Sequence, residues 1–281
     1  MRAGRMASPM RLCARQELVL AVRSRWTQMF AWIFAALAVA VAGSGYILSG
    51  GSGFQDFART AVSLVQLVLL LVPLMALVIG VLALAPDRGA AELLFAQPIA
   101  RHAILFGKLL GLFEALAAAQ AIGFGASGVL IFWQGGEQGL GSFLLLVGGS
   151  LALTAVFLGI SAVIAAGSIG RRARALALAL IVWFVAVILF DVAALGAASL
   201  LRSGTASRLL IAAVLVNPVD AVRTGVLLGV EGAAAFGAAS LAFLRFTHGP
   251  AGGAALLVLS IGLWVLVPPL VAARRLRDRD I

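Results

Sequence analysis

The chain has 281 residues, of which 63% are hydrophobic and 11% charged, and it carries a formal net charge of +10. Soluble domains are about half apolar and about a quarter charged, and disordered chains are poor in apolar residues, so both classes are excluded. The apolar residues form continuous runs rich in Leu and Ala rather than alternating barrel strands, and the basic residues flank these runs rather than forming a nucleic-acid footprint. The sequence therefore predicts an all-α integral membrane protein.

Residues 1–28 are predicted to form a cytoplasmic interfacial helix. Ser8 is suited to cap its start and Pro9 to occupy its first turn. Aliphatic and basic side chains separate around it, namely Leu12, Leu18, Val19 and Val22 against Arg11, Arg15 and Arg25. Such a helix can lie in the headgroup region with its arginines near anionic lipid. The alternative is a flexible basic tail that only enforces topology. The segment is too long for the n-region of a cleaved signal peptide.

Six apolar runs between residues 29 and 272 are each long enough to cross a hydrocarbon core of about 30 Å. They are Met29–Leu48, Ala61–Ala85, Leu109–Phe132, Phe143–Ala166, Ala175–Leu200 and Ala251–Ala272. Residues 273–281 form a basic cytoplasmic tail. Because the linkers are short, the whole chain, 1–281, is expected to be one membrane domain.

The basic residues predict the orientation of these runs. With the N-terminus placed inside, 16 of the 21 basic residues fall in inside segments and five fall outside. The five outside residues are Arg59, Arg202, Arg208, Arg223 and Arg245. Since short cytoplasmic loops are enriched in Lys and Arg, both termini are predicted to be cytoplasmic.

The connection after the second run predicts a short helix. Pro86 ends the run, Asp87 can cap a new helix, and Glu92 lies near its positive end. Leu93, Leu94 and Phe95 would give this helix an apolar edge before Pro98 stops it. A short capped helix at the cytoplasmic surface is suited to bind another protein. The alternative is an ordinary connection between spans.

This stretch also resembles a known family. Asp87–Arg88–Gly89, Glu92–Leu93–Leu94, Gln97–Pro98–Ile99 and Gly107–Lys108–Leu109–Leu110–Gly111 resemble the signature of ABC transporter permeases of the ABC type 2 superfamily. The resemblance implies a permease homodimer in the bacterial cytoplasmic (inner) membrane, whose coupling helix docks into a separate cytoplasmic ABC ATPase. The ATPase-coupling residues it implies are Asp87, Arg88, Gly89, Glu92, Leu93, Leu94, Gln97 and Pro98.

Other features are most similar to one group within this family. The chain length, the small outer loop after the first run and the sequence Asn217–Pro218–Val219–Asp220 resemble the permeases that serve maturation of nitrous oxide reductase, a copper enzyme. This likeness implies a NosF-like ATPase and a NosD-like periplasmic protein as partners. It implies that ATP and Mg bind the ATPase, with no cofactor in this chain.

The connection from Leu201 to Pro250 contains two shorter apolar stretches, Leu209–Val216 and Gly225–Val230. Neither is long enough to span a bilayer, so they are interpreted as re-entrant or interfacial helices on the outer face. The alternative is two further spans, Arg208–Val230 and Ala233–Phe246.

The same connection carries a prediction about a partner. Three charges and a proline interrupt its apolar stretches, so the segment from Asn217 to Glu231 is expected to reach water. Asn217, Pro218, Asp220 and Arg223 are therefore predicted to contact a periplasmic partner. The alternative is a lid that merely closes the dimer.

Two acidic residues lie inside predicted spans, and charges there are costly enough to suggest function. Glu114 is one turn into the third run and Asp191 well inside the fifth. The structural alternatives are that Glu114 snorkels to the interface or pairs with Arg171 or Arg172. For Asp191, hydroxyls such as those of Thr154 or Ser199 are the expected partners.

No catalytic or metal-binding pattern was found. Gly107–Lys108 is followed by Leu109 rather than Ser or Thr, so the P-loop pattern is missing and ATP hydrolysis is expected from another chain. His102 and His248 fall on opposite sides, and soft-metal ligands are scarce in the spans, which disfavours a copper path. Two other functions stay open: a conventional ABC type 2 exporter of a lipid, drug or polysaccharide, and an ion-coupled transporter using Glu114 or Asp191.

Overall fold

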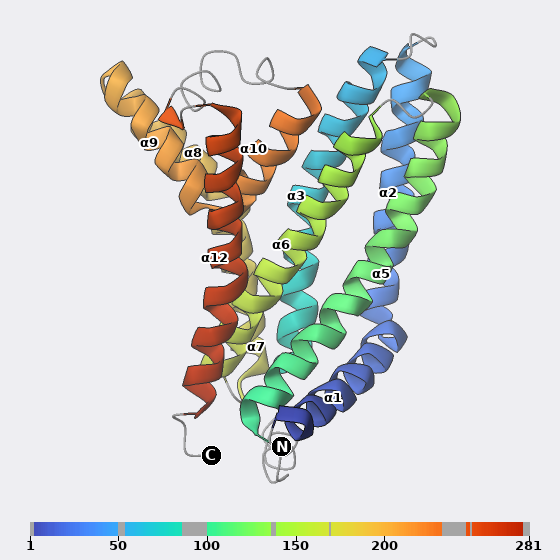
Figure 1. The fold of residues 1–281 in the computed structure, drawn as a ribbon, viewed down its shortest axis with the longest axis vertical. Coiled ribbons are helices and arrows are strands. Elements are labelled where there is room, and N and C mark those ends of the chain that lie inside the picture. Colours follow the sequence, from blue (N-terminus) through green and yellow to red (C-terminus); the bar gives the residue numbers. More distant parts are fainter. Residues whose placement is uncertain are drawn as a thin grey trace.

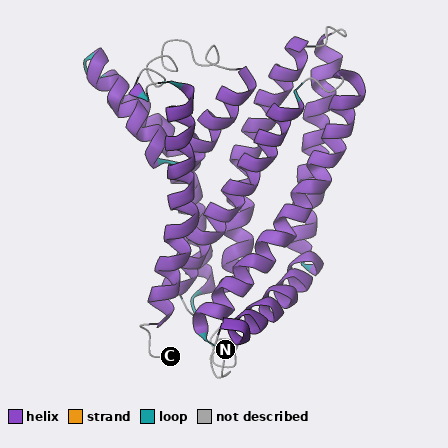
Figure 2. Cartoon of the chain, in the orientation of Figure 1, coloured by secondary structure: helices purple, strands orange, loops and turns teal. Residues whose placement is uncertain are grey.

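The computed structural model describes residues 3–49, 54–85, 100–135, 139–168, 170–231, 246–247 and 249–277. Its regular structure is helical throughout these residues (Figures 1 and 2). The elements are α1 (Ala3–Arg23), α2 (Arg25–Ser49), α3 (Phe54–Leu84), α5 (Arg101–Gly135), α6 (Leu140–Gly167), α7 (Arg172–Phe184), the π-helix η1 (Val185–Leu189), α8 (Phe190–Ser199), α9 (Ser203–Val216), α10 (Pro218–Glu231) and α12 (Pro250–Arg277).

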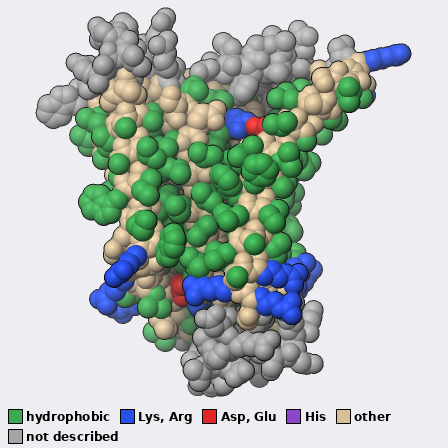
Figure 3. Space-filling model, turned by 180° about the vertical axis from the view of Figure 1, so that it is seen from behind, with side chains coloured by type: hydrophobic (Ala, Val, Ile, Leu, Met, Phe, Trp, Pro, Cys, Tyr) green, Lys and Arg blue, Asp and Glu red, His purple; other side chains and the backbone are tan. Residues whose placement is uncertain are grey.

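The six predicted spans are confirmed. Helices α2, α3, α5, α6 and α12, together with the continuous α7–η1–α8, carry stretches of 20 to 32 residues that are apolar enough to cross a membrane. Both chain ends lie at the same end of the bundle, which we call the basal end, and the other end is the distal end (Figure 1). Lys and Arg side chains gather toward the basal end, while hydrophobic side chains cover the middle (Figure 3).

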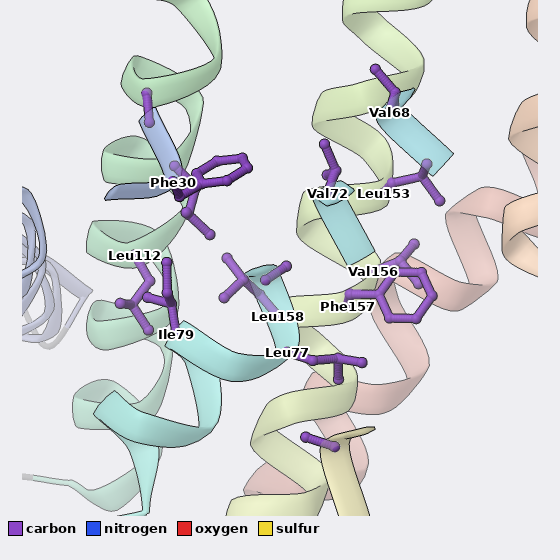
Figure 4. Packing of buried hydrophobic residues seen from close by; sticks show 14 of the residues in the cluster. Phe30, Val68, Val72, Leu77, Ile79, Leu112, Leu153, Val156, Phe157 and Leu158 are labelled. Carbon is purple, nitrogen blue, oxygen red and sulfur yellow. The ribbon is translucent and has the colours of Figure 1, made fainter. Parts of the chain in front are cut away.

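Helix α6 forms the centre of the bundle, because it packs against α3, α5, α10 and α12. Its Leu153, Val156 and Phe157 are fully buried, and Figure 4 shows them beside Val72 and Leu77 of α3. Lipid tails are as apolar as leucine, so helices in a bilayer associate by close packing more than by the hydrophobic effect. Small residues allow this close packing: Gly159 approaches Pro269 of α12 so closely that a Cβ on Gly159 would lie only 2.9 Å from it.

A buried polar cluster also joins α5 to α6. Gln120 Nε2 donates to Thr154 Oγ1 at 2.7 Å, and Ser150 Oγ donates to Gln120 Oε1 at 2.5 Å. The Thr154 hydroxyl in turn donates to the Ser150 carbonyl at 3.0 Å. Each side chain therefore has its partner inside the protein, as buried polar groups in a membrane require.

The N-terminal helix is confirmed, with its start corrected. It begins at Ala3 rather than after Ser8, and Pro9 lies inside it. On the side of the helix that packs on α5, Ala14, Glu17 and Ala21 are buried, while the aliphatic Leu12 is 67% exposed. In a membrane protein the aliphatic side can face lipid, which leaves small residues free to approach the neighbouring helix.

The pair of short helices predicted in the 201–250 connection is confirmed. Helices α9 and α10 meet at Asn217 with a bend of 101°. Both lie in the distal half of the molecule, so the chain enters and leaves at the same end (Figure 1). The alternative of one continuous span, Arg208–Val230, is wrong because the chain turns at Asn217–Pro218. The second alternative span, Ala233–Phe246, lies almost wholly outside the described residues.

Candidate functional site

The predicted coupling segment lies between two described helix ends. Its residues, Asp87, Arg88, Gly89, Glu92, Leu93, Leu94, Gln97 and Pro98, fall within residues 86–99, outside the described part of the chain. Helix α3 ends at Leu84 before it, and α5 begins at Arg101 after it. The attachments of these two ends therefore determine how the segment is held.

Two cations hold the end of α3. Lys108 Nζ of α5 donates to the Ala83 carbonyl at 3.2 Å, and Arg172 Nη2 of α7 donates to the Leu82 carbonyl at 3.2 Å. The last carbonyls of a helix have no partner within the helix and carry its negative dipole end. Cationic donors therefore stabilise the end of α3 and bind it to α5 and α7.

The start of α5 is held as well. Arg101 Nη1 donates to the Leu276 carbonyl at 2.9 Å, which ties this end to α12. Lys108 Nζ also lies 3.2 Å from Glu17 Oε2 of α1, whose side chain is 8% exposed. We call Glu17, Arg101, Lys108 and Arg172 the basal frame. Through it, both ends of the 86–99 segment are joined to α1, α7 and α12.

Two glycines of α5 allow the N-terminal helix α1 to pack closely against it. A Cβ on Gly107 would lie 2.7 Å from the Met10 carbonyl oxygen, and one on Gly111 would lie 2.8 Å from the Leu18 nitrogen. The Gly-x-x-x-Gly spacing is a known helix-packing pattern in membranes. In the sequence these glycines belong to the motif of the family resemblance, and their spacing is also the signal for this contact.

In the distal half, side chains bond several of the backbone groups that the break between α9 and α10 frees. The Leu215 carbonyl accepts a bond from Ser260 Oγ at 2.6 Å, and the Val216 carbonyl accepts one from Trp264 Nε1 at 3.0 Å. Asn217 Oδ1 accepts the Val219 amide at 3.1 Å and so caps α10. A backbone break at membrane depth is stable only with such partners.

Four polar side chains surround this break, and we call them the distal network: Asp191, Asn217, Asp220 and Arg223. Arg223 Nη1 lies 2.6 Å from Asp191 Oδ2 and 3.1 Å from Asp220 Oδ1. Asn217 Nδ2 donates to Asp220 Oδ2 at 3.0 Å and to the Ala186 carbonyl at 2.8 Å. One guanidinium thus serves two carboxylates from different helices.

The network connects the fifth span to the re-entrant pair. Ala186 lies in the π-helix Val185–Leu189, and Asp191 follows in the first turn of α8. A π-helical turn inside a span is uncommon and often marks a functional position. Because Asn217 bonds to the π-helical turn itself and Arg223 to Asp191 just after it, a movement of α7–α8 would reach α10 directly.

The structure corrects the expectations for the intramembrane charges. Asp191 pairs with Arg223, not with Thr154 or Ser199, because α10 folds back against the fifth span. Thr154 instead bonds within the α5–α6 cluster, and Ser199 donates to the Gly196 carbonyl. Glu114 is exposed, and no ion pair joins it to Arg171, Arg172 or any other described residue.

The expectation that residues 217–231 reach water is wrong for three of the four predicted contact residues, because Asn217, Pro218 and Asp220 are buried. Asn217 is 3% and Asp220 7% exposed, and Arg223 is used within the network. Contact of these residues with a periplasmic partner stays a prediction. Among the described residues, no group of three His, Cys, Asp or Glu side chains could hold a metal ion.

Comparison with known proteins adds two findings. Residues 12–281 match the family described as "ABC-2 family transporter protein". The chain is 35% identical over 235 residues to a Pseudomonas aeruginosa protein named "Probable ABC transporter permease protein NosY", covering 82% of this chain and 85% of the relative. It is 36% identical over 238 residues to the protein of the same name from Stutzerimonas stutzeri, covering 81% and 85%.

Proposed function

Because the chain belongs to the ABC-2 family of transporter proteins, we propose that it is a NosY-like permease that couples ATP hydrolysis by a separate ABC ATPase to a periplasmic partner or cargo. The observation that carries this proposal is the similarity to NosY permeases over about four fifths of the chain. In this role the permease serves maturation of the copper sites of nitrous oxide reductase.

The proposal assigns an orientation and partners. The basal end faces the cytoplasm of the bacterial inner membrane, in agreement with the asymmetry of basic residues. There a NosF-like ATPase, carrying ATP and Mg, binds the segment from Asp87 to Pro98. Two copies of this chain form the permease, and a NosD-like protein binds at the distal end. This chain has no catalytic role of its own.

The geometry supports transmission between the two ends. A force on the 86–99 segment reaches α1, α7 and α12 through the basal frame. Helix α7 continues through η1 into α8, where Asp191 holds Arg223 of α10. An ATPase can shift such a bundle only if its contacts differ between two states of the permease. The continuous α7–η1–α8 span provides a direct path for that shift.

Complementation tests the proposal. The chain, expressed with the ATPase and periplasmic protein of its own host, should restore reduction of nitrous oxide in a Stutzerimonas stutzeri strain that lacks NosY. Gas chromatography measures nitrous oxide consumption, and co-purification measures ATPase binding. Glu92→Arg should abolish both, because charge reversal on a short docking helix removes a large share of its contacts. Glu137→Arg, a matched reversal in the connection between α5 and α6, should leave both unchanged.

The outcomes separate the alternatives. If the ATPase co-purifies but nitrous oxide reduction is not restored, the chain is a conventional ABC type 2 exporter. If no ATPase co-purifies with the unmodified chain, the proposal fails and ion-coupled transport is favoured. Reporter fusions check the orientation: positions after Gly89 and Gly170 and at Ile281 should be cytoplasmic, and positions after Gly53, Gly136 and Gly204 periplasmic.

A further inference from the structure

The start of α2 has the features of an anion site. Ser24 separates α1 from α2, and the first bond of the new helix runs from the Gln28 amide to the Ser24 carbonyl at 3.0 Å. The first-turn amides of α2, at residues 25–27, therefore have no partner within their helix and lie at its positive end. Groups of this kind bind phosphate and carboxylate oxygens.

A buried hydroxyl at the same place lacks a partner. Thr27 is 3% exposed, and its Oγ1 atom makes no hydrogen bond within the structure. An unpaired buried hydroxyl costs free energy, so such groups usually have a ligand or water to bond. Thr27 lies in the first turn of α2, the same turn that carries the free amides of residues 25–27.

Thr27 also lines an apolar cavity that runs between α2 and α5. The cavity has a volume of about 190 Å³, and its lining includes Val22, Ala31, Trp32, Ala118 and Ile122. A dry apolar cavity of about 150 Å³ holds a benzene ring, so this one has room for part of an acyl chain. Trp32 beside it is 75% exposed and can face the lipid.

The charges near the cavity favour an anionic occupant. Arg23 and Arg25 are exposed and stand on either side of Ser24, next to the lining residues Val22 and Thr27. The nearest acid on α5 is Glu114, one turn before Ala118 on the same face of the helix. The last carbonyls of α1 lie at the same junction and oppose the dipole of α2, so Arg23 and Arg25 supply the positive charge that an anionic headgroup requires.

We propose that this is a binding site for one anionic phospholipid of the leaflet at the basal end. Its phosphate is held by the first-turn amides of α2, the Thr27 hydroxyl, Arg23 and Arg25. One acyl chain occupies the cavity between α2 and α5. The apolar cavity distinguishes this occupant from free phosphate, which has no group to place there. The bound lipid fixes the angle between α1 and α2, and α1 in turn carries Glu17 of the basal frame.

Native mass spectrometry of the purified protein in detergent tests the site with phosphatidylglycerol, phosphatidylcholine and inorganic phosphate as probes. We expect one phosphatidylglycerol to bind about tenfold more tightly than phosphatidylcholine, and excess phosphate not to displace it. Arg23→Gln with Arg25→Gln, and separately Ala118→Phe, should each weaken binding by about tenfold. Thr27→Val, which keeps the side-chain shape, should weaken binding several-fold.

Matched controls keep the test specific. Arg11→Gln with Arg15→Gln removes two exposed arginines from α1, and Ala121→Phe enlarges an exposed α5 residue that does not line the cavity. Both should bind phosphatidylglycerol like the unmodified chain. An equal loss in the arginine control, or unchanged binding in Ala118→Phe, would overturn the proposal. So would conversion of a dimer to a monomer by Ala118→Phe, since the cavity would then be a protein interface.

Discussion

The basal frame and the distal network both join helices through charged side chains, but their partners differ. At the basal end, separate cations donate to carbonyls at helix ends, and Arg172 does so from an exposed position. At the distal end, two carboxylates, one amide and one guanidinium bond mainly to each other around a break in the backbone. The first arrangement tolerates the loss of Arg172, because Lys108 remains at the end of α3. The second tolerates no such loss, because Asp191 and Asp220 share the single cation Arg223.

The largest effect should come from removing the shared cation. Arg223→Met leaves Asp191 and Asp220 without their common partner in a mostly buried place. Breaking a buried ion pair by removing one member costs about 3 kcal/mol or more, since the remaining charge is uncompensated. The midpoint of thermal unfolding in detergent should fall accordingly. Arg202→Met, an exposed arginine near the end of the same span, is the control and should have no measurable effect.

A smaller loss is expected at the cap of α10. Asn217→Ala removes the acceptor of the Val219 amide and the donor to Asp220 and to Ala186 of the π-helix. Leaving buried polar groups unsatisfied should lower the free energy of unfolding by about 2 kcal/mol. Thermal unfolding in detergent measures it, with Ser199→Ala as the control because that hydroxyl is exposed and bonds only locally. Equal effects of the two variants would show that the break does not depend on its cap.

The spans were predictable because the bilayer sets the length of an apolar run, and all six predicted runs became helices. The turn at Asn217–Pro218 was predictable because proline favours the first position of a new helix and asparagine the cap. The partner of Asp191 was not, because Arg223 lies 32 residues further along the chain and approaches only after α10 folds back.

Two other features depend on packing rather than on local sequence. The π-helix Val185–Leu189 has no marker in its apolar run, and its Ala186 carbonyl is bonded by the side-chain amide of Asn217, at the break between α9 and α10. The aliphatic residues of α1 do not indicate which of its sides is buried. In a bilayer these residues can face lipid, and the small residues opposite Gly107 and Gly111 form the protein contact.

At the basal end, close packing should matter more than any single charge. Gly111→Ala places a Cβ against the backbone of α1, whereas Gly125→Ala, the control in the same helix, meets nothing within 4 Å. Overpacking costs of order 1 kcal/mol or more, which should raise transient detachment of α1 about tenfold. Cys13, the single cysteine, packs on Gly107, so the rate of thiol labelling measures this detachment. Equal labelling rates in both variants would contradict the close packing of α1 on Gly107 and Gly111.

The smallest effect should come from Arg172→Met. Arg172 is exposed, and its partner, the Leu82 carbonyl, lies next to the Ala83 carbonyl that Lys108 already holds. A cation at an exposed helix end contributes about 0.5 kcal/mol, so the thermal midpoint should barely move, as in the control Arg174→Met. The loss should become larger when Lys108→Met is added, and larger than the sum of the two single changes, because the end of α3 then has neither cation. If Arg172→Met alone destabilised the protein as much as Arg223→Met, the claim that Lys108 compensates for the loss of Arg172 would be wrong.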